Sequence, residues 1–112
     1  MTTTTDLAVR IMKRAGILDP SESPTAQESE DVVAILESKY DELKERGVID
    51  WTLTDIPTRS MDAFVSVVAG SVAFEFRTLT PEVADMAAKG ERTLYALIER
   101  KEDTRNSPAV DY

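Results

Sequence analysis

The side chains of this 112-residue chain that could do chemistry are carboxylates, hydroxyls and amines, because the sequence contains no histidine and no cysteine. Without histidine, the commonest general base and the commonest transition-metal ligand are missing. Without cysteine, there are no thiolate nucleophiles, no cysteine metal sites and no disulfides. A catalytic or metal site would have to be built from oxygen atoms or from an amine.

The clearest carboxylate pattern is a row of acids at four-residue spacing, made by Glu37, Asp41 and Glu45. Carboxylates one helical turn apart can bind a hard cation or share a proton. Lys44 and Arg46 lie among these acids, and no oxygen-rich calcium loop accompanies them. We therefore interpret the row as a solvated charged face and expect no metal site there.

The remaining candidates for catalysis are serines and lysines, and none has an activating neighbour in the sequence. Ser60, Ser66 and Ser71 have no nearby base, and the lysines stand in charged rather than apolar surroundings. The four glycines are isolated, so no phosphate-binding loop is formed. These observations predict a protein that is not an enzyme and that holds no cofactor or metal ion.

Charge is unevenly distributed along the chain, whose net charge is −8. This balance argues against a grip on nucleic acid, which needs a basic surface, but not against a protein that merely surrounds DNA. Residues 1–17 carry Arg10, Lys13 and Arg14 against one acid, whereas residues 18–50 carry ten acids against three bases. A basic end and an acidic flank would suit head-to-tail association of identical copies, with the three basic residues as candidate partner contacts. The alternative is that both faces are simply solvated.

Two amphipathic segments in the first half of the chain predict helices with defined ends, the first of them short. Thr5 is a candidate N-cap for the first helix, and Gly16 is its expected stop. The second helix begins at a capping-box pattern, in which Thr25 and Glu28 would each bond the other's backbone N–H. Gly47 is the expected stop of this helix. The apolar positions of both segments recur with helical spacing.

The second half of the chain predicts two further helices. Pro57 suits the first turn of the third, whose apolar residues surround much of its circumference and predict the most buried helix, with Phe64, Val68 and Phe74 in the core. Gly70-Ser71 in its middle indicates a kink or a close-packing point. The fourth helix opens at Thr80-Pro81-Glu82. Gly90 on its apolar stripe predicts a tight approach to the third helix.

Two segments outside these helices are candidates for binding a partner. Residues 48–54 are rich in β-branched and aromatic residues, and predict a plain loop or a ribbon paired with another copy. Trp51 within them would be a core residue or an interface anchor. Residues 103–112 predict a tail that either frays or docks on a partner through Pro108, Val110 and Tyr112.

The fold class that follows is all-α, a compact bundle of four principal helices with an extended loop and a C-terminal tail. We expect one helical domain over residues 1–102 and a tail over residues 103–112. The longest apolar run is far below membrane-spanning length, and the N-terminal residues lack the basic and apolar regions of a secretory signal. We therefore expect no membrane association, and synthesis in the cytosol.

The order of these elements resembles the head-to-tail adaptor proteins of tailed bacteriophages, also described as head-completion or packaged-DNA-stabilising proteins. The similar elements are a first helix ending in Arg14-Ala15-Gly16-Ile17-Leu18, the turn Ser21-Glu22-Ser23-Pro24-Thr25-Ala26-Gln27-Glu28, a helix through Leu36 and Tyr40, Ile56-Pro57 opening an apolar helix, and Pro81 opening the last. Together they cover most of residues 7–98.

The resemblance implies a non-enzymatic protein of the virion neck, made in the cytoplasm of the bacterial host. Such adaptors form a ring, typically of twelve subunits, beneath the portal protein; the ring extends the DNA channel and connects the capsid to tail components. DNA would pass through without specific binding, and the C-terminal segment would reach toward the portal. The alternative from another class is an acidic helical regulator that binds one partner protein in a bacterial cell.

Overall fold

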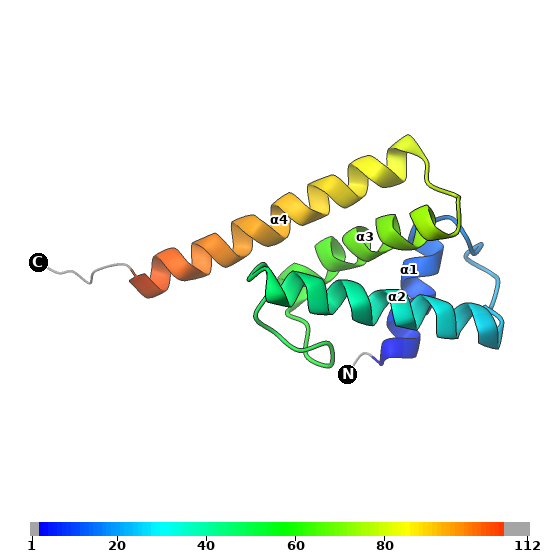
Figure 1. The fold of residues 1–112 in the computed structure, drawn as a ribbon, viewed down its shortest axis with the longest axis horizontal. Helices are drawn as coiled ribbons and strands as arrows, with labels where there is room; N and C mark the ends of the chain where they lie inside the picture. The colour runs from blue at the N-terminus through cyan, green and yellow to red at the C-terminus, as the bar shows by residue number, and fades with distance from the viewer. Residues whose placement is uncertain (1–2, 107–112) are drawn as a thin grey trace, which may run out of the picture.

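A computed structural model describes the backbone of residues 3–106 and the side chains of residues 3–100. Over this range the chain forms four helices and no strand: α1 (Thr4–Arg14), α2 (Ala26–Glu45), α3 (Thr58–Glu75) and α4 (Pro81–Asn106) (Figure 1). The predicted all-α bundle of four helices is confirmed. Helix α4 continues through Asn106 and therefore includes the first residues of the expected tail.

Threonine hydroxyls cap the starts of three helices. At α2 the predicted capping box is present: the Thr25 hydroxyl accepts from the backbone N–H of Glu28 at 3.1 Å, and the Glu28 carboxylate accepts from the N–H of Thr25 at 2.9 Å. Helix α4 begins after Thr80, whose hydroxyl accepts from the Val83 N–H. The prediction for α1 was wrong, because its N-cap is Thr3 rather than Thr5.

The displaced start of α1 has a simple physical reason. Several adjacent threonines offer the same capping hydroxyl, so the residue three positions later selects among them. Asp6 follows Thr3 at this distance and completes a second capping box. The carboxylate also lies in the first turn, where the helix dipole favours a negative charge.

Three helices end in the same hydrogen-bonded turn, in which the chain enters the left-handed region one residue after the C-cap. Gly16 after α1 and Gly47 after α2 have φ angles of 80° and 75°, as their positions in the sequence predict. After α3 this place is taken by Arg77, at a φ of 59°. The Thr78 N–H then bonds the Ala73 carbonyl at 2.8 Å, which completes the turn without a glycine.

Helix α3 is the centre of the molecule and packs against each of the other three helices. Phe64 and Val68 are fully buried, as predicted. Phe74 is not a core residue: its exposed fraction is 71%. It follows Gly70 by one turn and so shares the α3 face that approaches α4. The hollow beside it is lined from α4 by Ala84, Ala87, Ala88 and Glu91, and the three short alanine side chains leave the ring uncovered.

The approach of α3 to α4 is as tight as the two helical glycines predict. A Cβ atom added to Gly90 would lie 2.7 Å from the backbone oxygen of Ala63, and one added to Gly70 would lie 2.5 Å from the Cβ of Ala87. Both distances are shorter than carbon atoms tolerate, so only glycine fits at these positions. Gly70 is therefore a close-packing point between the helices.

The arrangement of the helices leaves part of α4 outside the bundle. Helices α1 and α2 pack against α3, and α4 packs along α3 so that its C-terminal part projects past the other three helices (Figure 1). The α2–α3 connection lies beside the place where α4 leaves the bundle. Residues 48–54 within this connection form a loop, which was the first of the two predictions for them.

Candidate functional site

The loop after α2 is held in place by an aromatic cluster around Trp51. The Trp51 ring meets the buried Phe64 ring edge to face, with centroids 5.1 Å apart and planes at 90°, and the Tyr40 ring lies 6.1 Å away. The Tyr40 hydroxyl donates to the Trp51 carbonyl at 2.7 Å, and Lys44 donates to the same hydroxyl. Trp51 is only half-buried, so one part of its ring belongs to the core and the rest stays accessible.

Beside Trp51 lies a mostly apolar hollow, which we call the loop cavity. Its volume is about 520 Å³. The loop and the start of α3 form one wall, and the projecting part of α4 forms the other; the lining residues are Val48, Asp50, Trp51, Pro57, Arg59, Ser60, Leu94, Leu97, Ile98 and Arg100. Most of the accessible lining is apolar. Such a concave apolar site suits an apolar side chain better than a charged substrate.

A second apolar surface lies at the other end of α3, where the chain turns into α4. We call it the corner patch and define it by Phe74 and Leu79, whose exposed fractions are 71% and 42%. Glu75 and Arg77 beside Phe74 are exposed too. Large apolar side chains exposed together on a small domain are typical of protein contacts. Phe74 and Leu79 also line a hollow of about 430 Å³ between α3 and α4. The corner patch and the loop cavity therefore lie at opposite ends of α3.

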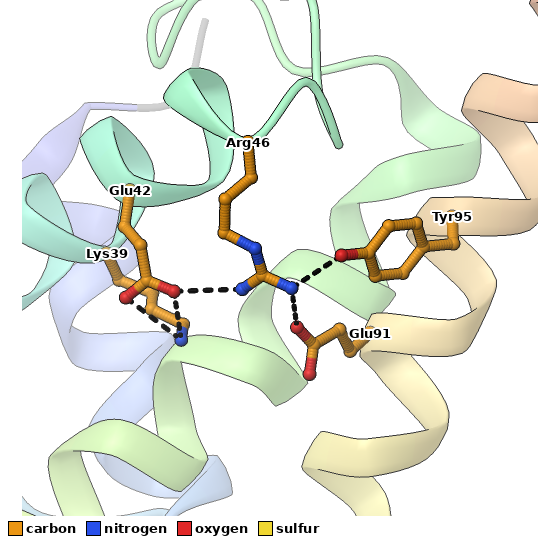
Figure 2. A network of polar contacts seen from close by, with 5 residues as sticks. All are labelled: Lys39, Glu42, Arg46, Glu91 and Tyr95. Atoms are coloured by element: carbon orange, nitrogen blue, oxygen red, sulfur yellow. Dashed lines mark hydrogen bonds and ion pairs between the residues drawn. The ribbon is translucent and has the colours of Figure 1, made fainter.

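A polar network ties α2 to α4 across the surface between these two sites (Figure 2). Arg46, at the C-cap of α2, donates to Glu42 on its own helix at 2.9 Å and to Glu91 on α4 at 2.8 Å. The same guanidinium donates to the hydroxyl of Tyr95 on α4, and Lys39 completes the network by pairing with Glu42 at 3.2 Å. One arginine thus bridges two helices that otherwise meet through α3.

The network shifts two pKa values in the directions expected for ion pairs. Hydrogen bonds from Arg46 and then from Lys39 lower the pKa of Glu42 below its usual value of 4.5. Hydrogen bonds to Glu91, Tyr95 and Glu42 raise the pKa of Arg46 further above its already high value. Both groups therefore stay charged near neutral pH. The network is partly exposed, and its ion pair between Arg46 and Glu91 joins α2 to α4.

The basic residues predicted as partner contacts divide into two kinds. Arg10 and Lys13 are exposed on α1. Arg14 is bound within the molecule, because its guanidinium donates to the Ser66 hydroxyl and to the Asp62 carboxylate on α3, both at 2.8 Å. Pro108, Val110 and Tyr112, the predicted anchors of the tail, lie outside the described residues.

The described residues contain no group of three or more acidic side chains placed to hold a metal ion. Buried Ser66 accepts its hydrogen bond from Arg14, which is a cation and cannot act as a base. Within residues 3–106, none of the helices combines the length and apolar character needed to cross a membrane.

Sequence reasoning missed both the exposure of Phe74 and the Arg46 network. The alanines at 84, 87 and 88, all on the α4 stretch facing Phe74, are the signal that could have revealed the exposure. The Arg46 contacts had no comparable signal, because Glu91 and Tyr95 lie 45 and 49 residues away in the sequence.

No protein-family model, curated protein or solved structure matches this chain. The resemblance described for the sequence therefore stays an expectation.

Proposed function

We propose that this chain is a non-enzymatic structural protein of a tailed-bacteriophage virion, a head-to-tail adaptor that assembles into a ring beneath the portal protein. In this function it would extend the DNA channel in the neck and connect the capsid to tail components. The observation that carries the proposal, beside the resemblance in sequence, is that the small helical domain has apolar contact surfaces at both ends of α3. A ring subunit needs two such surfaces, because it meets one neighbour on each side.

The exposed face of α2 fits the wall of a DNA channel. Its exposed acids include Glu30, Asp31, Glu37, Asp41 and Glu45. A surface of this sign repels phosphate, so DNA would pass along it without sticking. The exposed Arg10 and Lys13 on α1 are available for contact with an acidic surface of a neighbour or of the portal.

Electron microscopy of the chain mixed with the portal protein of the same virus tests the proposal. We expect ring-shaped density with the symmetry of the portal on one of its faces, and no such density for the portal alone. If the chain does not bind the portal and instead forms a one-to-one complex with a bacterial protein, the adaptor proposal is wrong and the alternative of an acidic regulator is favoured.

A further inference from the structure

We propose that Phe74 of one copy inserts into the loop cavity of the next copy, so that identical chains associate head to tail. The inference rests on the proposed function and deepens it, because it names the contact between neighbouring subunits. The partner of the loop cavity is therefore a second copy of this chain, through its corner patch.

The side chain that would insert into the neighbour is Phe74, an exposed aromatic residue on the central helix. Phe74 is exposed although every other large apolar residue along α3 is buried or half-buried, and Leu79 beside it is exposed as well. Aromatic residues at the centre of an apolar patch are the side chains that most often dominate binding energy. Leaving such a ring in water is unfavourable, and covering it removes apolar surface from water.

The receiving half has the size and the lining that a phenyl ring needs. A cavity of roughly 150 Å³ lined by aliphatic and aromatic side chains is enough to bind benzene. The loop cavity, at about 520 Å³, has room for Phe74 and for Leu79 as well. Trp51, Leu97 and Ile98 supply aromatic and aliphatic lining, against which a ring packs well.

The two halves lie at opposite ends of one helix. Ser60 at the cavity and Phe74 in the corner patch are fourteen residues apart on α3, which corresponds to roughly 21 Å along its axis. One copy therefore cannot fill its own cavity with its own Phe74. A contact between two different surfaces of identical chains leaves one of each free, so it propagates into a ring if the rotation closes.

Both halves carry charges of both signs: Glu75 and Arg77 beside Phe74, and Arg59, Arg100 and Asp50 at the loop cavity. Glu75 and Arg59 are both exposed. When Phe74 enters the cavity, the carboxylate of Glu75 would pair with Arg59 on the rim. Opposite charges around an apolar contact set its orientation and speed its formation.

Cysteine cross-linking tests this contact directly, because the chain has no cysteine of its own. Glu75→Cys and Arg59→Cys would be made as single variants of the full chain, mixed and mildly oxidised. We expect the mixed dimer to form about tenfold or more faster than either variant forms a dimer with itself. A chain with both substitutions should give a ladder of cross-linked oligomers. The background rate of cross-linking by chance collision is measured by mixing Arg59→Cys with Glu30→Cys, because Glu30 is an exposed residue of α2 outside the proposed contact.

A second substitution separates the contact from chance collisions. Adding Phe74→Glu to the Glu75→Cys chain should lower the mixed-dimer rate to the background. Adding Ala34→Glu instead, which introduces the same charge at an exposed position of α2, should leave the rate unchanged. Circular dichroism of each variant checks that the helices are intact. Self-dimers that form as fast as mixed dimers, a mixed-dimer rate at background, or indifference to Phe74→Glu would each overturn the proposal.

This experiment and the portal experiment fail independently. Rings on the portal without cross-linking at these positions would keep the adaptor function and discard the Phe74 contact. Cross-linking without portal binding would keep the contact and discard the adaptor.

Discussion

Phe64 and Phe74 lie ten residues apart on the same helix, yet their surroundings differ completely. The Phe64 ring is fully buried and meets Trp51 edge on, whereas 71% of Phe74 is exposed. Phe64→Ala should lower the free energy of unfolding by about 3–5 kcal/mol, because it opens a cavity in the core. Phe74→Ala should change it by less than about 0.5 kcal/mol. Urea unfolding of dilute protein measures both; equal losses would mean that Phe74 is covered.

Glu42 provides a pH-dependent contribution to stability through Arg46. Its lowered pKa means that the folded state prefers the ionised carboxylate, so the contribution is present above the ordinary pKa of 4.5 and is lost as pH falls through the lower folded value. The pair is about half exposed, so its worth at pH 7 is at most about 1 kcal/mol.

The test compares the unfolding free energies of the wild type and Glu42→Gln. The wild type should be more stable at pH 7, and the difference should shrink as the pH is lowered below 4.5 and through the lower folded pKa, because protonation then removes the charge that glutamine lacks. Arg46 stays protonated throughout this range and adds no pH dependence of its own. A difference that does not shrink at all on acidification would show that packing, not charge, accounts for it.

The contact between α3 and α4 depends on the missing side chain of Gly90. Replacing glycine by alanine inside a helix normally stabilises it by about 1 kcal/mol. Here the added methyl would meet the backbone oxygen of Ala63 at 2.7 Å, so Gly90→Ala should destabilise the protein by about 1–3 kcal/mol. The exposed Ala96 of the same helix is the control: Ala96→Gly should cost about 1 kcal/mol through propensity alone. A Gly90→Ala protein that unfolds at higher urea than the wild type would contradict the close approach.

The turn between α3 and α4 holds Arg77 in a left-handed conformation that a side chain disfavours. Arg77→Gly should therefore stabilise the folded protein by about 1 kcal/mol and raise its melting temperature, since the same hydrogen-bonded turn forms without steric cost. Arg77→Ala keeps a Cβ atom and should bring no such gain. If both substitutions raise the melting temperature equally, the cause lies in the lost charge and not in the backbone.

At the scale of the whole molecule, we expect the C-terminal residues to contribute to assembly and not to folding. A truncated chain separates the two contributions. The last core residue of the described part of the chain is Leu94, so deletion of residues 104–112 should leave the melting temperature of the dilute chain nearly unchanged. Binding to the portal or ring formation should weaken, because these residues carry the predicted anchors. Light scattering of portal mixtures measures the second effect. Undiminished assembly of the truncated chain would remove the tail from the proposed function.

Local rules in the sequence were enough to predict the elements and most of their ends. The Thr25–Glu28 capping box, the stops at Gly16 and Gly47, and the burial of Phe64 and Val68 all follow from residues within one or two helical turns. Even the close approach at Gly90 could be predicted, because a glycine on the apolar stripe of a helix has few other uses.

Contacts between distant segments were decided only by the tertiary structure. Helical periodicity says that Phe74 lies on an inner face, but its exposure depends on how small the α4 side chains opposite it are. The loop cavity likewise needs the loop with Trp51 and the part of α4 with Ile98 to lie close together, and Arg46 needs α4 to lie beside the end of α2. Local sequence determines which helices form and which faces are apolar. It does not determine which part of each face a neighbour covers, because this depends on the relative placement of whole helices.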